Sequence, residues 1–168
     1  MTTISIERFG SFFLVNFTDL TLEEKKMVLT WRNHNEIKKW MYNQNDILLD
    51  NHLMYIENLS NSIDKKYFIV KQNESYIGVV DFIQIDDKNK ECEFGLYANP
   101  FEKTVGIGRI LEELCIKYVF EILKFKKLKL EVFTENKQVR NLHKKYNFQE
   151  ISTKKTGSKT VICMELEK

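Results

Sequence analysis

The feature that most constrains the fold of this chain is the stretch Asn99–Arg109, which reads NPFEKTVGIGR. It lies between an apolar run typical of a strand, Glu91–Ala98, and an apolar pattern typical of a helix, Ile110–Leu123. Gly106 and Gly108 stand where the strand run gives way to the helix. Glycine lacks a Cβ and adopts positive φ readily, so this loop can direct several backbone N–H groups at one anion. With the N-terminus of the following helix, it predicts a phosphate or pyrophosphate site.

The residues around the loop exclude two common nucleotide-binding motifs. A Walker loop requires Lys and then Ser or Thr after its last glycine, and neither pair follows Gly108. A dinucleotide fingerprint lies early in the first βαβ unit and requires a third glycine, where this chain has Leu111. The loop therefore indicates a pyrophosphate site within a mixed α/β domain.

Length, charge and cysteine content narrow the class of protein. The 168 residues fit one domain, residues 1–168, and 43% apolar with 30% charged residues is typical of a compact globular chain. A net charge of +2 gives no indication of a nucleic-acid partner. Cys92, Cys115 and Cys163 lack metal-ligand spacing and are typical of reduced core residues. Without a signal sequence or a long apolar run, we expect a cytoplasmic protein that does not span a membrane.

Hydrophobic periodicity predicts seven strands and four helices. The predicted strands are residues 12 to about 19, 66–71, 76–85, 91–98, 128–133, 148–154 and 160–166, and the predicted helices are residues 22–31, 50–59, 110–123 and 136–146. The capping box Thr21-x-x-Glu24 predicts that the first helix begins at Leu22. A crossover through the helix after the glycine loop makes two neighbouring strands parallel in a mostly antiparallel sheet.

This order of elements, with x-x-G-x-G opening the helix after the fourth strand, resembles the GNAT superfamily of N-acetyltransferases. Asn136 followed by Leu142–Phe148 (LHKKYNF) resembles the superfamily motif N-x-x-A-x-x-L-Y-x-x-x-G-F. The resemblance implies an α/β fold with a mixed, mostly antiparallel sheet of about seven strands and about four helices. It also implies that strands four and five are parallel and splay around coenzyme A, with acetyl-CoA as co-substrate and no metal.

Carried onto this sequence, the resemblance implies a set of coenzyme A contacts. These are Leu96, Tyr97, Lys103, Thr104, Val105, Gly106, Ile107, Gly108, Arg109 and Asn136. Lys103 stands where the superfamily usually has Gln or Arg. Its charge suits a phosphate, but lysine cannot bind phosphate oxygens as a planar fork.

The superfamily's tyrosine, which stands near the coenzyme A sulfur, is replaced here by His143. Imidazole titrates near neutral pH, so His143 is the favoured proton donor to the leaving thiolate. Tyr146, one helical turn further on, is the rival donor. The alternative that neither residue donates, and that both pack in or line the site, stays open.

Acetyl transfer to an amine also needs a base and donors to the developing oxyanion. Asp81, Glu93 and Glu131 are the carboxylates on strands expected at the site, and Glu131, acting through water, is favoured, with Glu93 next. Strand alternation puts Glu131 on the face opposite its apolar neighbours, so a plain surface carboxylate is the alternative. Backbone N–H groups near Leu96 and Tyr97 are the expected oxyanion donors.

Four further strings narrow the resemblance. WRNH (Trp31–His34), KKYF (Lys65–Phe68), IGVVDF (Ile77–Phe82) and EFGLYANP (Glu93–Pro100) resemble the acetyltransferase subfamily of bacterial pseudaminic acid biosynthesis. That resemblance implies transfer of acetyl to the C4 amine of UDP-4-amino-4,6-dideoxy-N-acetyl-β-L-altrosamine, whose product feeds a nonulosonic acid used in flagellin glycosylation.

A nucleotide-sugar substrate requires a cation that binds its diphosphate and an aromatic or hydrogen-bonding surface that contacts its uracil. The planar guanidinium of Arg32 is the expected diphosphate partner. The remaining predicted substrate contacts are Trp40, Met41, His52, Asp81 and Tyr97. Trp40 and Met41 are equally typical of core residues, and His34 of a local structural role. No zinc site is expected, since no histidine pair has helical ligand spacing.

Two other functions stay open at this level. One is a GNAT enzyme that acts on a protein N-terminus or a polyamine, although a polyamine site requires a strongly acidic surface. The other is a non-catalytic acetyl-CoA-binding module, which the histidine at position 143 favours. The sequence also leaves open whether the chain forms a homodimer.

Overall fold

The computed structural model describes residues 1–168, and its centre is one eight-stranded sheet with the order β1-β2-β3-β4-β5-β6-β8-β7. The strands are β1 (Thr2–Ile6), β2 (Gly10–Asn16), β3 (Lys66–Gln72), β4 (Ser75–Asp86), β5 (Glu91–Ala98), β6 (Lys127–Phe133), β7 (Gln149–Thr156) and β8 (Lys159–Glu167). The helices are α1 (Leu22–Arg32), α2 (Asn35–Lys38), α3 (Leu49–Leu59), α4 (Ile107–Lys117) and α5 (Lys137–Lys145). Every strand pair is antiparallel except β5–β6.

The architecture confirms the mixed, mostly antiparallel sheet but corrects the number of elements. The sheet has eight strands rather than about seven, because β1 pairs with β2 from Thr2 opposite Leu14 onward. The α-helices number five rather than about four, because the short α2 follows α1. The parallel pair is therefore the fifth and sixth strands of the chain, although it consists of the two segments that the sequence indicated.

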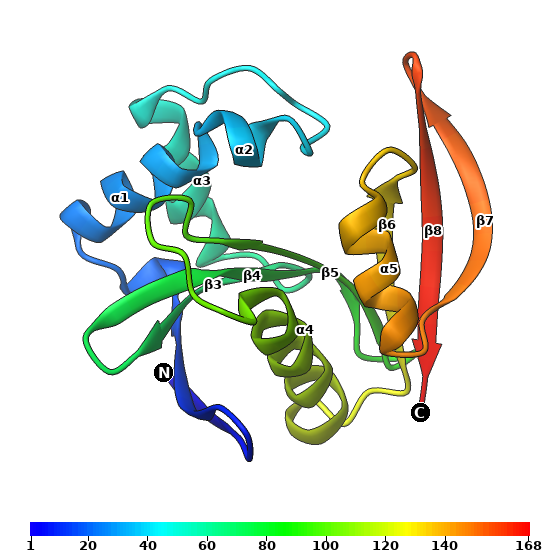
Figure 1. Ribbon diagram of the computed structural model, residues 1–168. Helices are drawn as coiled ribbons and strands as arrows, with labels where there is room; N and C mark the ends of the chain where they lie inside the picture. The colour runs from blue at the N-terminus through cyan, green and yellow to red at the C-terminus, as the bar shows by residue number, and fades with distance from the viewer.

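Helices cover both faces of the sheet (Figure 1). α1 and α3 pack on one face through a small cluster that includes Val28, Trp31 and Ile56. α4 packs on the other face through the main core, which includes Leu111 and Leu114. Side chains of a strand alternate between the faces, so β4 sends Val79 to the first cluster and Phe82 to the second.

The start of α1 follows from local hydrogen bonds. Thr21 Oγ1 accepts from the N–H of Glu24 at 3.2 Å, and a Glu24 carboxylate oxygen accepts from the N–H of Thr21 at 2.9 Å. This reciprocal pair is the predicted capping box, and the helix begins at Leu22 as expected. None of the helices combines the length and the apolar character that crossing a bilayer requires.

The parallel pairing of β5 with β6 is short. It joins Glu91, Cys92 and Glu93 to Lys127, Leu128 and Lys129, and no further pair follows. β5 then continues to Ala98 and β6 to Phe133 without hydrogen bonding to each other, and the two strands diverge in Figure 1. The predicted splay is therefore present, and the facing backbone edges of both strands are open over these residues.

Phe82, on β4, packs in the main core against the helical segment Tyr118–Ile122, which follows α4. Its ring stacks on Tyr118 with centroids 4.6 Å apart, and the residue has no solvent exposure. We expect Phe82→Ala to lower the free energy of unfolding by about 3–5 kcal/mol, because the cavity is only partly refilled. Urea denaturation measures this. Phe101→Ala, at a position 59% exposed, is the matched control and should change it by less than about 0.5 kcal/mol.

Candidate active site

The glycine loop presents unpaired backbone donors at the start of α4. Gly106 has φ of 75°, in the left-handed region, and forms the N-cap with no side chain capping the helix. The N–H groups of Gly108 and Arg109 lie in the first turn and find no acceptor within the chain. A Cβ on Gly108 would lie 3.1 Å from Leu142 Cδ2, so this glycine lets α4 approach α5 closely. The arrangement suits a pyrophosphate.

The loop is anchored at its beginning by Asn99, which sequence analysis did not single out. This buried side chain accepts from the N–H of Phe101 at 2.9 Å and donates to the carbonyl of Tyr76 at 2.9 Å. The residues that follow it, Lys103 and Val105, are exposed, and Lys103 forms no ion pair. The loop is therefore fixed at its base and open along the residues predicted to meet coenzyme A.

The remaining predicted coenzyme A residues lie along the splay. Leu96 and Tyr97 belong to the part of β5 that has lost β6 as a partner. Asn136 forms the N-cap of α5, just after β6; its N–H donates to the carbonyl of Phe133 at 2.9 Å, whereas its side-chain amide has no partner in the chain. These positions place open backbone and amide groups on both sides of the splay, which is the space that an extended pantetheine arm requires.

Three carboxylates form a row across the face of the sheet toward α1 and α3, and we call them the carboxylate row. Asp81 is on β4, Glu93 on β5 and Glu131 on β6. Asp81 lies opposite Gly95, where a Cβ would stand 2.7 Å from Asp81 Oδ2, so the absence of a side chain there gives the carboxylate its room. The row belongs to three adjacent strands at the point where β5 and β6 separate.

Burial controls the charge of this row. The pKa of Asp81 is raised to about 7, mainly by burial and further by the charge of Glu93. Burial likewise raises the pKa of Glu93, with Glu131 adding to the rise and Lys154 opposing it. Solvent still reaches part of Asp81 and Glu93, so both carboxyl groups are available to a ligand.

Glu131, the favoured base of the sequence analysis, is fully engaged. One oxygen accepts from Lys154 Nζ on β7 at 2.6 Å, and the other accepts from the hydroxyl of Tyr42. Asp81, in contrast, accepts no hydrogen bond from the chain although it is only half-buried. The structure thus leaves Asp81, and not Glu131, with free acceptor capacity.

Tyr42, which the sequence analysis missed, bridges two parts of the molecule. Besides its bond to Glu131, its ring packs edge-on against Phe133 with centroids 5.6 Å apart. Tyr42 belongs to the segment between α2 and α3, whereas its partners lie on β6, about 90 residues later in the chain. No local pattern in the sequence signals this contact.

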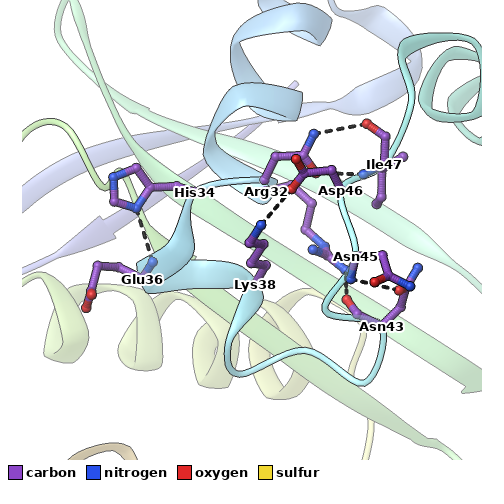
Figure 2. A network of polar contacts seen from close by, with 9 residues as sticks. Arg32, His34, Glu36, Lys38, Asn43, Asn45, Asp46 and Ile47 are labelled. Atoms are coloured by element: carbon purple, nitrogen blue, oxygen red, sulfur yellow. Dashed lines mark hydrogen bonds and ion pairs between the residues drawn. The ribbon is translucent and has the colours of Figure 1, made fainter.

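The segment that carries Tyr42 has no regular structure but is held by polar contacts (Figure 2). Arg32 Nη2 donates to the carbonyl of Asn43 at 2.8 Å, and Lys38 pairs with Asp46 at 2.8 Å. Asn33 donates to the carbonyl of Ile47 at 2.9 Å and accepts from its N–H at 2.8 Å. These contacts fix the position from which Tyr42 reaches β6.

Arg32 lies at the end of α1 beside the carboxylate face of the sheet. Burial lowers the pKa of its guanidinium, while the nearby Tyr97 and Tyr67 oppose that effect. Its Nη2 is used by Asn43, but Nη1 is buried and has no partner in the chain. A buried guanidinium N–H without an acceptor is costly, so Nη1 is a ready donor to an anionic or polar ligand.

The other predicted substrate contacts fall into two groups. Trp40 and Met41 are half-buried in the segment that carries Tyr42, close to the carboxylate face. His52 lies elsewhere: it is buried between α3 and α1, where Nε2 shares a hydrogen bond with the carbonyl of Lys25 at 2.9 Å. Burial lowers the pKa of His52, which favours the neutral imidazole.

The two candidate proton donors lie on the opposite side of the sheet, on or next to α5. His143 is 4% exposed, and its Nδ1 lies 2.8 Å from Glu112 Oε1. The ring packs edge-on against Phe94, with centroids 5.9 Å apart, and Phe94 is the first β5 residue beyond the last pair with β6. His143 therefore lies beside the beginning of the splay.

Tyr146 is the second candidate donor, and its hydroxyl is already used. It donates to Glu113 Oε1 at 2.7 Å, and the same oxygen pairs with Arg8 at 2.7 Å. Burial, followed by this hydrogen bond, raises the pKa of Tyr146 to about 12. Asn147, at the glycine position of the motif, has φ of 70° and so keeps the left-handed turn that ends α5.

Together these features fit a class of protein: a transferase that takes an acyl group from a pyrophosphate-containing thioester and delivers it to an amine. The glycine loop suits a pyrophosphate, the splay suits an extended arm, and the carboxylate row suits an amine. The comparisons with known proteins agree. The family described as "Acetyltransferase (GNAT) domain" matches residues 15–149.

Two Campylobacter jejuni findings extend this assignment. The "Acetyltransferase PseH" of serotype O:2 is 43% identical over 135 residues, which cover 80% of this chain and 83% of that protein. The crystal structure of the N-acetyltransferase PseH in complex with acetyl coenzyme A is 35% identical, with a TM-score of 0.76, and covers 94% of this chain and 99% of that one. The chain therefore belongs to the GNAT family, as predicted, and is an acetyl-CoA-dependent N-acetyltransferase.

A third comparison concerns the fold alone. The spermidine N-acetyltransferase of Vibrio cholerae, in complex with CoA and spermine, has a TM-score of 0.82 with 20% identity, and covers 93% of this chain and 95% of that one. At this identity the likeness shows a shared backbone arrangement and not a shared acceptor.

Gly106 gives a direct test of the predicted coenzyme A site. We expect Gly106→Ala to weaken CoA binding about tenfold in calorimetric titration, because a left-handed alanine strains the loop that presents the N–H donors. The matched control is Gly157→Ala in the β7–β8 turn, where φ is 60° and no atom lies within 4 Å of the new Cβ. Both variants should lose about 1 kcal/mol of stability. Equal CoA affinity in both would contradict the assignment of the loop.

Proposed function

We propose that the chain transfers acetyl from acetyl-CoA to the C4 amine of a UDP-linked 4-amino-4,6-dideoxy-N-acetyl hexose, as a step of pseudaminic acid biosynthesis that serves flagellin glycosylation. The observation that carries the proposal is that one face of the sheet holds both Asp81, a carboxylate with free acceptor capacity, and the unpartnered guanidinium N–H of Arg32, with Tyr97 near both. The 43% identity to the Campylobacter acetyltransferase supports the same acceptor class.

Asp81 is the proposed base. An amine reaches the site largely protonated, and a carboxyl group with a pKa near 7 both attracts the ammonium form and accepts its proton at neutral pH. Glu93 lies next to Asp81 in the row, and its negative charge helps to raise the pKa of Asp81. Glu131, bound to Lys154 and Tyr42, acts in this proposal by holding Tyr42 in place.

Arg32 and two aromatic rings are the proposed nucleotide contacts. Nη1 of Arg32 supplies a charged donor for the diphosphate, while its bond to Asn43 keeps the guanidinium plane fixed. Tyr67 and Tyr97 lie beside it and offer apolar faces for the sugar or the uracil. Trp40 and Met41 remain proposed contacts, whereas the position of His52 between two helices gives it no part here.

Acetyl-CoA, when bound, supplies the acetyl thioester whose C–S bond breaks as the amine nitrogen bonds to the acetyl carbon. The residues that would hold it are the glycine loop for the pyrophosphate and the open β5 edge for the pantetheine arm. Backbone N–H groups near Leu96 and Tyr97 are the proposed donors to the oxygen that gains charge. His143 is the proposed donor to the sulfur, with Tyr146 as its rival.

A polyamine acceptor is the second candidate, because the carboxylate row also suits a polycation. Two observations speak against it. Arg32 adds an unpaired positive charge to the same face, and Lys154 already neutralises Glu131. A polyamine would therefore meet repulsion at both ends of the row.

Thiol release from acetyl-CoA tests the proposal with three acceptors in parallel: the UDP-4-amino sugar, spermidine and a peptide with an N-terminal alanine. We expect turnover with the sugar alone, because only its diphosphate uses Arg32. Arg32→Lys should then raise the KM for the sugar, since lysine loses the planar fork. Turnover with spermidine would assign the polyamine function, and CoA binding without any turnover would leave the non-catalytic module.

Asp81→Asn separates a role in catalysis from a role in folding. The folded pKa of about 7 exceeds the ordinary value of 3.8, so the folded protein binds more protons than the unfolded one between these values. The free energy of unfolding of the wild type therefore falls as pH rises from 3.8 to about 7, and Asp81→Asn removes this pH dependence. We expect a higher melting temperature than the wild type at about pH 8, together with a kcat/KM lower by about tenfold or more.

The control is Asp87→Asn, at an exposed turn position that pairs only with Lys90, and it should change neither quantity. An Asp81→Asn variant that is less stable and less active would indicate a structural role and would contradict the assignment of Asp81 as base.

A further inference from the structure

A buried carboxyl–imidazole pair lies in the main core, on the side of the sheet away from the carboxylate row. Glu112 is on the inward face of α4 and has no solvent exposure. Its Oε1 lies 2.8 Å from His143 Nδ1, and its Oε2 has no partner in the chain. A buried carboxylate is costly unless it is paired, so the apolar core alone gives no reason for a glutamate here.

His143 is the only basic side chain within ion-pair distance of Glu112. On α4, burial raises the pKa of Cys115 well above its ordinary value, so this thiol is neutral. Next to α5, Tyr146 directs its hydroxyl to Glu113. Lys144 points outward to Glu150 at 3.2 Å, and Lys145 is exposed.

The other ring nitrogen of His143 keeps contact with solvent. The chain contains only two fully buried side-chain nitrogen or oxygen atoms without a partner, Arg32 Nη1 and Glu112 Oε2. His143 Nε2 has no hydrogen-bond partner either and is not one of these two, so it is accessible. Phe94 flanks the ring at the beginning of the splay, which is the adjacent opening.

We infer that Glu112 is a positioning residue for the proton transfer to the leaving sulfur. An ionised carboxylate can only accept, so Glu112 fixes a proton of His143 on Nδ1 and holds the ring. His143 then donates from Nε2. The inference rests on the proposed acetyl transfer but not on the identity of the acceptor.

The proton balance of the step is complete with the residues present. As the N–C bond forms and the C–S bond breaks, the sulfur takes the electron pair and then the proton from His143 Nε2. Before attack, Asp81 takes one proton from the ammonium group and releases it to water; after the N–C bond forms, the nitrogen loses a second proton to Asp81. Exchange with water afterwards returns a proton to His143 and removes one from Asp81, so the net products are an amide and a free thiol.

The pair also gives a physical reason for a histidine at the position where the family motif has tyrosine. A tyrosine donates as a neutral group and needs no counter-charge, whereas an imidazole must be cationic to donate and still keep Nδ1 protonated. A cation in this apolar surrounding requires a nearby anion, and Glu112 supplies it.

Glu112→Gln tests the inference, because glutamine keeps the shape and an acceptor oxygen but removes the charge. With whichever acceptor turns over, we expect kcat to fall about tenfold, while the KM for acetyl-CoA changes less than about twofold. In a His143→Tyr background the same substitution should leave kcat unchanged. Glu121→Gln, at an exposed position paired with Lys117 at 3.3 Å, is the control.

Nitrogen NMR of the wild type keeps the test valid if Glu112→Gln does not fold. The signals of His143, assigned by their loss in His143→Phe, should show a proton on Nδ1. A proton on Nε2 alone, or an unchanged kcat in Glu112→Gln, would overturn the inference. If no acceptor turns over, the acetyl-transfer proposal fails, and the NMR result by itself decides whether Glu112 fixes the tautomer.

Discussion

The structure depends on the early end of the hydrogen bonding between β5 and β6. Pairing stops after Glu93 and Lys129, although both strands continue. Backbone N–H and C=O groups left unpaired inside a sheet are costly unless a ligand or water forms hydrogen bonds with them. The splay is therefore suited to binding an extended ligand. The glycine loop closes one end of it, because the loop is the direct continuation of β5 into α4.

Strand alternation then divides the chemistry between two faces. Asp81 and Glu93 project toward α1 and α3, whereas Phe94, one residue further on, projects into the core that holds His143. The proposed base for the acceptor and the proposed donor for the sulfur thus lie on opposite sides of the same opening.

Burial has opposite consequences on these two faces. On the carboxylate face it raises the pKa of Asp81 toward neutrality, which suits a base but makes the folded protein less stable above that pH. In the core, the burial of Glu112 is balanced by the imidazole at 2.8 Å. In both places, a buried ionisable group is held where the proposed chemistry uses it.

The sequence by itself determined what depends on short-range pattern. Gly106 and Gly108 indicated the phosphate loop, and the capping box at Thr21 fixed the start of α1, because turn and cap geometry depends on adjacent residues. Only the tertiary structure decided which charged groups meet. The bond of Tyr42 to Glu131, and that of Glu112 to His143, join residues 89 and 31 positions apart, so the free carboxylate and the partnered histidine could be distinguished only after the chain had packed.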